Sequence, residues 1–154
     1  KALSDAEDIA AISRRARYSL LYVLRENETR TISKIILPVH GYGLWSTLYG
    51  FLSLEGDMNT VSGITFYEHG ETAGLGGEVD NPDWKKSWEG KKIYSDGSVA
   101  LRVVKGKASA DSSDYDFQID GLSGATLTSR GVENMVAYWL GKDGFGPVLA
   151  KLGG

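Results

Sequence analysis

The clearest helical pattern lies near the end of the chain, in five apolar residues spaced by three and four: Val132, Met135, Val136, Trp139 and Leu140. This spacing places side chains on one face of an α-helix. Gly141 follows the run, and glycine commonly follows a helix end. The pattern therefore predicts an amphipathic helix over about residues 128–141, with its apolar face buried.

Runs rich in β-branched and aromatic residues predict strands at residues 18–25, 30–39, 61–68 and 99–105. Asn27-Glu28-Thr29 is a turn sequence, so the first two strands are expected to form a hairpin. Pro38 weakens the end of the second strand, because proline has no N–H to donate. Residues 44–54 mix strand and helix signals.

Three further helices are predicted from their start signals. Ser4 and Glu7 have the spacing of a capping box, which predicts a helix over about residues 4–16. Asn81-Pro82 and Gly146-Pro147 each place proline at the start of a short helix. Strands and helices do not alternate regularly. We therefore expect one α+β domain over residues 1–154, with an antiparallel sheet or half-barrel flanked by helices.

Composition excludes several classes of function. The 154 residues are 42% apolar and 24% charged, values typical of one globular domain. A net charge of −3 gives no electrostatic reason to expect a nucleic-acid partner. The absence of cysteine excludes disulfides, thiolate metal sites and a cysteine nucleophile. The sequence contains no apolar run long enough to cross a bilayer and no signal peptide.

The segment from Asp120 to Ser129 carries the strongest chemical signal. Small residues precede the hydroxyl of Thr126, which lies just ahead of the predicted helix. No neighbouring residue in the sequence is suited to activate Thr126 as a nucleophile. The pattern therefore favours a threonine that another protein modifies, with backbone space for a phosphate. The simpler alternative is that Thr126, Thr128 or Ser129 only caps the helix.

Two other glycine-rich segments are candidates for the same site. Residues 67–76 read as a loop between a strand and the helix at Asn81-Pro82, and residues 38–46 contain a Gly-x-Gly without the rest of a dinucleotide fingerprint. His69 and Glu71 are two metal-ligand types without a third, which is weak evidence for a metal site. His40 has no catalytic partner nearby in the sequence and is interpreted as structural.

A hydrolase is the rival hypothesis from another class. Gly121-Leu122-Ser123-Gly124 is similar to part of a nucleophile elbow. Ala125 stands where that motif requires its last glycine, so the pattern fails. No catalytic residue is therefore assigned.

The string Asp120-Gly-Leu-Ser-Gly-Ala-Thr126 resembles the flavinylation motif of the FMN-binding domain family, Asp-x-x-Ser/Thr-Gly-Ala-Thr. The family's last threonine carries FMN through a phosphoester, so the resemblance implies that Thr126 is the attachment residue. It also implies that Ser123, Gly124 and Ala125 surround the phosphate. Asp120 is expected to hold the loop or to help the modifying enzyme dock, because a carboxylate repels phosphate.

Glu71-Thr-Ala-Gly-Leu-Gly76 matches the second recurring string of that family, which lies beside the flavin ring. The resemblance implies that Glu71 and Thr72 hydrogen-bond the polar edge of the ring. It also implies that Gly74 and Leu75 lie against the ring face. Outside this string, Tyr42 and Trp45 are interpreted either as core residues or as residues that stack near a flat cofactor. We expect the strings at 70–77 and 120–126 to lie side by side.

Residues 38–46 and 131–147 further resemble the C subunits of Na⁺-translocating NADH:quinone reductases, and the match covers about residues 34–152. The resemblance implies an electron-carrier domain of that membrane complex, on the periplasmic side of the bacterial inner membrane. NADH oxidation, ubiquinone reduction and Na⁺ export would belong to the whole complex.

The resemblance also implies an apolar membrane helix before Lys1 and partners among the other subunits. Attachment of FMN would require an FAD:protein FMN transferase, so protein made without that enzyme would lack FMN. Two alternatives remain at this point. One is a domain like the G subunit of an Rnf-type electron-transport complex, and the other is an assembly module without a cofactor.

Overall fold

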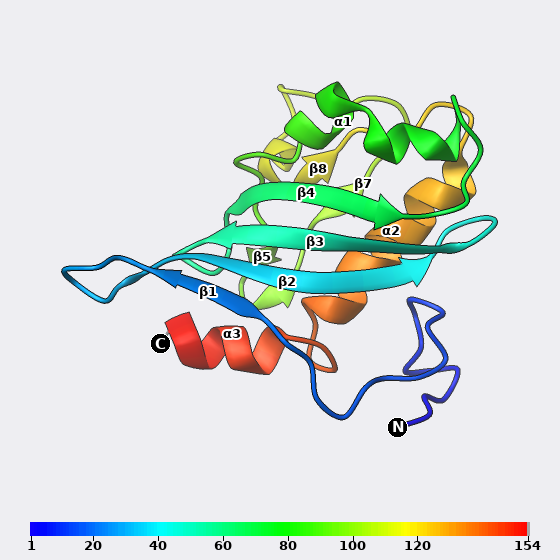
Figure 1. The fold of residues 1–154 in the computed structure, drawn as a ribbon. Helices are drawn as coiled ribbons and strands as arrows, with labels where there is room; N and C mark the ends of the chain where they lie inside the picture. Colours follow the sequence, from blue (N-terminus) through cyan, green and yellow to red (C-terminus); the bar gives the residue numbers. More distant parts are fainter. Residues whose placement is uncertain (154) are drawn as a thin grey trace.

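The centre of the molecule is a four-stranded antiparallel sheet with the order β1-β2-β3-β4. Its strands are β1 (Tyr22–Arg25), β2 (Ile32–Tyr42), β3 (Thr47–Glu55) and β4 (Val61–Glu68). In this computed structural model, which describes residues 1–153, the long helix α2 (Thr126–Trp139) crosses one face of the sheet (Figure 1). The arrangement is the single α+β domain with an antiparallel sheet that the sequence predicts.

The other elements are short and surround the sheet. Helix α1 (Pro82–Lys86) follows a 3₁₀ turn (Gly76–Asp80), and α3 (Gly146–Gly153) closes the chain. Two small ladders lie beside them: β5 (Tyr94–Ser95) pairs with β6 (Ser98–Val99), and β7 (Arg102–Val103) pairs in parallel with β8 (Gln118–Ile119). A second 3₁₀ turn (Tyr115–Phe117) leads into β8.

The core forms between α2 and the inner face of the sheet. Alternate side chains of β2 and β3 are buried there, as the two-residue period of a strand requires: Ile35, Leu37, Val39, Leu48, Leu52 and Leu54. The predicted apolar face of α2 meets them. Gly41 permits this close approach, because a Cβ at Gly41 would lie 2.8 Å from the Cβ of Met135.

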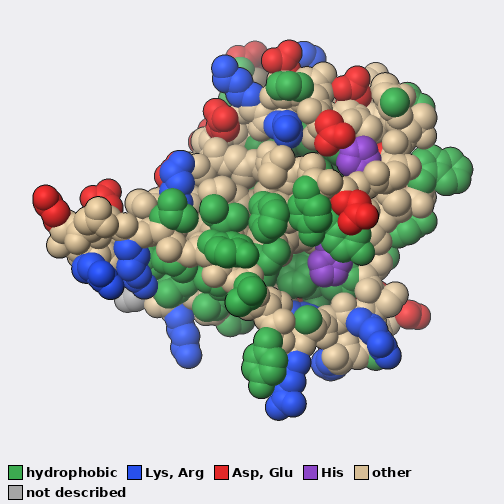
Figure 2. All heavy atoms as spheres, viewed as in Figure 1, with side chains coloured by type: hydrophobic (Ala, Val, Ile, Leu, Met, Phe, Trp, Pro, Cys, Tyr) green, Lys and Arg blue, Asp and Glu red, His purple; other side chains and the backbone are tan. Residues whose placement is uncertain are grey.

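The outer face of the sheet carries a row of neighbouring rings. The ring centroids of His40 and Tyr49 are 5.6 Å apart, and those of Phe51 and Tyr67 are 5.4 Å apart. Tyr67 is 62% exposed. Figure 2 shows this face, with apolar side chains gathered over β2, β3 and β4.

The predicted helix over residues 4–16 is wrong. Residues 4–16 form turns, although Ser4 and Glu7 do make part of the capping box: the Ser4 backbone N–H donates to Glu7 Oε2 at 3.1 Å. The Asp8 carboxylate then accepts from the backbone N–H groups of Ile12 and Ser13, both at 2.7 Å. Ala11 has a φ of 52°, outside the right-handed helical region. Local side-chain bonds to the backbone therefore replace the helix.

The predicted strands lie where the sequence indicated, but most of their ends differ from the predicted ones. β1 begins at Tyr22, and β2 runs through Pro38 to Tyr42. Pro38 is tolerated because β1 begins at Tyr22, opposite Ile36, so β2 has only one neighbouring strand at Pro38. The expected strand over residues 99–105 is divided between β6 and β7.

Two of the three remaining helices begin where their start signals indicate. α1 begins after Asn81, whose side chain accepts from the Asp83 N–H as its predicted N-cap. α3 begins at Gly146. α2 begins at Thr126, two residues earlier than expected, and this shift changes the roles of the hydroxyl residues in its first turn.

Candidate functional site

Three loops meet at the N-terminus of α2: residues 42–46, residues 70–77 and residues 120–125. We call them, with the first turn of α2, the three-loop site. Close approaches show the contacts. A Cβ at Gly124 would lie 3.0 Å from Leu75 Cδ2, and a Cβ at Gly76 would lie 2.5 Å from Thr128 Oγ1. The two strings expected to lie side by side therefore do so.

Glu71 connects the loops. Its side chain is buried, with 8% of the residue exposed. Oε1 accepts from the backbone N–H of Leu44 at 2.6 Å and from the Thr128 hydroxyl at 2.9 Å. Oε2 accepts from the backbone N–H of Trp45 at 2.9 Å and from the Ser46 hydroxyl at 3.4 Å. One carboxylate thus joins the 42–46 loop to the first turn of α2.

These hydrogen bonds keep the Glu71 carboxylate ionised. Burial alone would raise its pKa, because a low-dielectric surrounding disfavours the charged form. The donors from Leu44, Trp45, Thr128 and Ser46 outweigh burial, and the pKa lies below its usual value of 4.5. Each of these donors stabilises the anion more than the protonated acid.

His69 supports the same loop from its other side. Its Nδ1 accepts from the Glu71 backbone N–H at 3.1 Å, which leaves the proton of a neutral ring on Nε2. Nε2 lies 2.7 Å from Asp80 Oδ2 and donates to it. His69 and Glu71 are therefore both engaged in holding the loop. Within residues 1–153, no group of three metal-ligand side chains is arranged to hold an ion.

The 120–125 loop is fixed mainly by its own polar groups. The Asp120 Oδ1 accepts from the Ala108 N–H at 2.8 Å, and the Asp120 carbonyl accepts from Trp84 Nε1 at 2.8 Å. The Leu122 N–H donates to the buried Ser129 hydroxyl at 3.0 Å. Of the two roles considered for Asp120, the structure shows the loop-holding one.

Thr126 is exposed at the first position of α2. Ala125 precedes it and offers no side chain to cap the helix, and Gly124 turns the chain with a φ of 69°. The first N–H groups of a helix have no partner inside the helix, and they lie at the positive end of its dipole. The Thr126 hydroxyl therefore lies beside a position that suits an anion.

Exposed apolar side chains are carried by the segments that meet at the start of α2. They come from the 42–46 loop, the 70–77 loop and α2, with exposed fractions of 65% for Trp45, 56% for Leu127, 44% for Leu75, 43% for Tyr42 and 37% for Leu44. Large apolar residues this exposed and this close together are unusual on a protein surface. An anion position beside an apolar rim suits a flat ligand that carries a phosphate.

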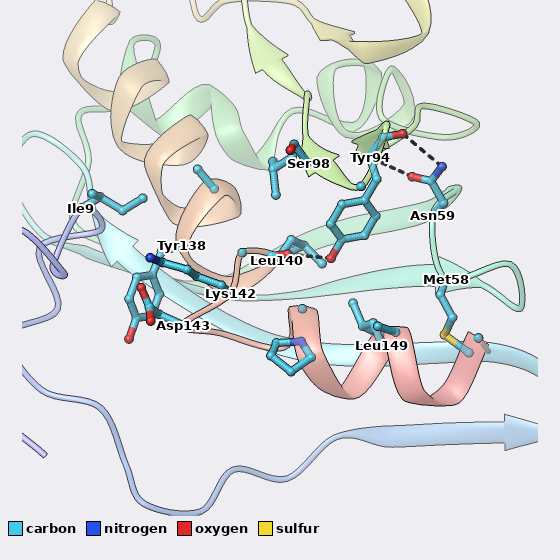
Figure 3. Close-up of a pocket in the computed structure, with 18 of the residues that line it drawn as sticks. Ile9, Met58, Asn59, Tyr94, Ser98, Tyr138, Leu140, Lys142, Asp143 and Leu149 are labelled. Carbon is cyan, nitrogen blue, oxygen red and sulfur yellow. Dashed lines mark hydrogen bonds between the residues drawn. The ribbon is translucent and has the colours of Figure 1, made fainter.

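A separate cavity of about 1020 Å³ lies elsewhere, between the end of α2, α3 and the β3–β4 turn. Tyr94 and Leu140 line it, and the Tyr94 hydroxyl donates to the Leu140 carbonyl at 2.6 Å (Figure 3). No residue of the three-loop site is among its lining residues. The candidate site is therefore the open three-loop surface, and this cavity is a different feature.

Comparison with known proteins gives a consistent picture. The model of the FMN-binding domain family matches residues 43–141, which include the loops at 70–77 and 120–125 and all of the 42–46 loop except Tyr42. The C subunit of the Na⁺-translocating NADH-quinone reductase of Pseudomonas aeruginosa is 56% identical over 152 residues, covering 98% of this chain and 58% of the relative. Its counterpart in Yersinia pestis is 51% identical over 152 residues, covering 98% of this chain and 56% of the relative.

The chain belongs to the FMN-binding domain family. The two relatives named above are C subunits of Na⁺-translocating NADH-quinone reductases. The crystal structure of NqrC from Shewanella oneidensis has a TM-score of 0.85 at 38% identity, covering 94% of this chain and 65% of that one. The chain spans 58% of the length of the Pseudomonas relative and 56% of the Yersinia relative.

The FMN-binding domain brings most of the expected site residues together, with one change of role. Ser123, Gly124, Thr72, Gly74 and Leu75 are exposed in their loops. Ala125 is buried beneath Thr126, while Tyr42 and Trp45 lie at the rim. Glu71, which was expected at the edge of the ring, instead directs both carboxylate oxygens to protein donors.

The capping role considered for Thr128 and Ser129 is wrong. Neither caps α2, because the helix has already begun at Thr126 and both hydroxyls are buried against other loops. A signal for this was present in the apolar spacing: Thr128 lies four residues before Val132, on the face of α2 that is buried.

Proposed function

We propose that this domain carries FMN on Thr126 through a phosphoester and acts as an electron carrier. The observation that carries the proposal is the position of Thr126, exposed at the uncapped start of α2. Exposed Leu75 lies against the preceding Gly124, and Glu71 joins the loop of exposed Trp45 to Thr128. FMN contains both a phosphate and a flat apolar ring, so these residues fit it. When bound, FMN would supply the redox chemistry and the protein its position and surroundings.

Each part of the site has a role in this proposal. The N–H groups of the first turn of α2 would hold the phosphate, with Ser123 and Gly124 beside it. Leu75 and Trp45 would lie against the ring, and Tyr42 would border it. Thr72 would line the ring's polar edge, and Gly74 would lie beside Leu75. Glu71 would organise these loops without touching the ring, because its two oxygens already accept four hydrogen bonds.

We further propose that the domain works within an Na⁺-translocating NADH:quinone reductase, where it would pass electrons on the route to ubiquinone. Identity above 50% to C subunits over almost the whole chain supports this assignment. None of the helices in residues 1–153 has the length and apolar character needed to cross a bilayer. In the proposal, an apolar helix before Lys1 holds the domain to the inner membrane, on its periplasmic side.

Attachment of the cofactor would need an external enzyme of the FAD:protein FMN transferase class, since the residues around Thr126 provide no base for its hydroxyl. A G-subunit-like domain of an Rnf-type complex is the second candidate, and the family match alone would allow it. The resemblance of residues 38–46 to the C subunits favours the first assignment.

Co-expression with an FAD:protein FMN transferase tests the attachment. Intact-mass and peptide mass spectrometry should find one added FMN phosphoester on Thr126 in the wild-type protein and in Thr126→Ser. Thr126→Ala should fold, as judged by circular dichroism, and remain colourless. Thr128→Val, which keeps Thr126 but removes the neighbouring hydroxyl, should still be yellow. Covalent FMN on Thr126→Ala would disprove the assignment.

A further inference from the structure

Glu71 is an unusual residue for its surroundings. It is a buried carboxylate, and within residues 1–153 no lysine, arginine or histidine forms an ion pair with it. Buried charges are normally paired, because transfer out of water is unfavourable. Here two backbone N–H groups and two hydroxyls replace the cation. The domain thus keeps a charge buried at the point where its three loops meet.

We propose that Glu71 is the positioning residue of the flavin site: its carboxylate holds the 42–46 loop against the first turn of α2 and so sets where Trp45 lies relative to Thr126. The inference rests on the proposed function for the flavin itself. The link between the loop and the helix does not depend on that function, and it can be measured in protein without FMN.

The geometry requires a carboxylate. The successive N–H groups of Leu44 and Trp45 donate to the two different oxygens of Glu71, so both oxygens must be acceptors. A glutamine at this position would turn its NH₂ group toward one of these N–H groups, and that donor would lose its partner. An aspartate would be one methylene too short to reach the loop and Thr128 together.

The surrounding glycines are consistent with this role. A Cβ at Gly43 would overlap Glu71 Oε1, and a Cβ at Gly76 would lie 3.1 Å from Glu71 Cβ. Both positions therefore leave space for the carboxylate to reach the backbone of the loop. Gly131 allows the same loop to approach α2, because a Cβ there would overlap the Tyr42 carbonyl oxygen.

Trp45 depends on this arrangement more than its neighbours do. Its side chain is 65% exposed, so few side-chain contacts define where it lies. Its backbone N–H is fixed by Glu71 at 2.9 Å. Ser46 adds a second link, since its hydroxyl accepts from the Gly70 N–H at 2.6 Å and also donates to Glu71. Loss of the carboxylate therefore frees the 42–46 loop, which contains Trp45, from the first turn of α2.

Amide hydrogen exchange on FMN-free protein tests the link directly. In Glu71→Gln, whichever of the Leu44 and Trp45 amides faces the new NH₂ group should exchange at least about tenfold faster, the lower limit for losing a hydrogen bond to a charged group. Exchange at Leu122, which donates to Ser129, should stay at the wild-type rate relative to global unfolding. Exposed Glu68→Gln is the matched control. Unchanged exchange at Leu44 and Trp45 would overturn the proposal, as would a uniform increase that follows global stability.

Flavin emission provides the functional readout, because a stacked tryptophan quenches flavin fluorescence. With FMN attached, Trp45→Ala should give the upper limit of emission, and Glu71→Gln should recover at least half of that increase. Emission at the wild-type level in Glu71→Gln would also overturn the proposal. Thr128→Val provides a second variant if Glu71→Gln does not fold, and it should move emission in the same direction. A wild-type protein without FMN on Thr126 would disprove the proposed function but not the exchange result.

Discussion

The Thr128 hydroxyl donates to Oε1 of Glu71 at 2.9 Å, although the two residues are 57 positions apart in the chain. The bond connects the first turn of α2 to the loop that follows β4. Thr128 is 1% exposed, so water does not compete for its hydroxyl. Because Glu71 also binds the 42–46 loop, its carboxylate joins two loops of the three-loop site to the first turn of α2.

Replacement of Thr128 by valine removes the hydroxyl while keeping the side-chain volume. The Glu71 carboxylate then lacks one of its donors, and hydrogen bonds to charged groups contribute about 1.5–3 kcal/mol. We expect Thr128→Val to lower the free energy of unfolding in urea by that amount. Thr128→Ser keeps the hydroxyl and should lose less. Equal stability of the valine variant and the wild type would contradict the role given to this bond.

The ionised state of Glu71 predicts that the stability of the domain falls at acid pH. The folded-state pKa of Glu71 lies below its usual value of 4.5, so the unfolded chain takes up this proton first as the pH falls. The stabilisation is therefore complete above about pH 4.5 and is lost as the pH falls through the folded-state pKa. The difference in unfolding free energy between wild type and Glu71→Gln should shrink in that range. Asp57 and Glu7 also have lowered pKa values, but both variants share them.

The sequence and the structure predict opposite effects of Gly131→Ala on stability. Helix propensity alone predicts that Gly131→Ala stabilises α2 by about 1 kcal/mol. The structure predicts a net loss of about 1–3 kcal/mol, because the new methyl group would overlap the Tyr42 carbonyl and lie 2.9 Å from Gly43 Cα. Urea denaturation decides the sign. Gly63→Ala is the control, since a Cβ there meets nothing within 4 Å.

Tyr94 connects the β5–β6 ladder to the end of α2. Its hydroxyl donates to the Leu140 carbonyl, and burial raises the pKa of Tyr94 to about 12. Tyr94→Phe should destabilise the domain by about 1 kcal/mol. In the wild type the unfolded tyrosine ionises near pH 10.0 and the folded one near 12, so stability should fall between these values.

Absorbance titration checks the ionisation of Tyr94. Because the folded Tyr94 stays protonated near pH 10.0, folded wild type and folded Tyr94→Phe should show equal changes in tyrosinate absorbance at that pH. In denaturant the wild type should show the larger change, since Tyr94 is then free to ionise. A larger change in the folded wild type would mean that the hydroxyl is not protected.

Local patterns predicted the elements whose signals lie within a few residues. The apolar spacing around Val132 defined the buried face of α2, and Asn81-Pro82 defined the start of α1. The helix over residues 4–16 could not be excluded in this way. Its capping residues are present, but the competing bonds from Asp8 to Ile12 and Ser13 favour turns. Such a choice between two local structures depends on the packing of the whole segment.

The sequence motifs of the candidate site could be predicted, but the three-dimensional arrangement of their side chains could not. The strings around Thr126 and Leu75 were correctly expected to be neighbours. The role of Glu71 was not, because a carboxylate in a glycine-rich loop looks in sequence like a ligand-binding group. Its donors come from residues 44–46 and from Thr128, and only the docking of α2 on the sheet brings these together.

The long sequence separation between Glu71 and Thr128 has a consequence for the order of folding and cofactor attachment. The surface around Thr126 forms only after the hairpin of β2 and β3, the segment after β4 and helix α2 have packed together. A nascent chain that has not folded presents residues 120–126 as an ordinary flexible peptide. An enzyme that recognises the assembled surface would therefore act only on folded molecules. Under the proposed function, a molecule that carries the cofactor would then be one that folded correctly before attachment.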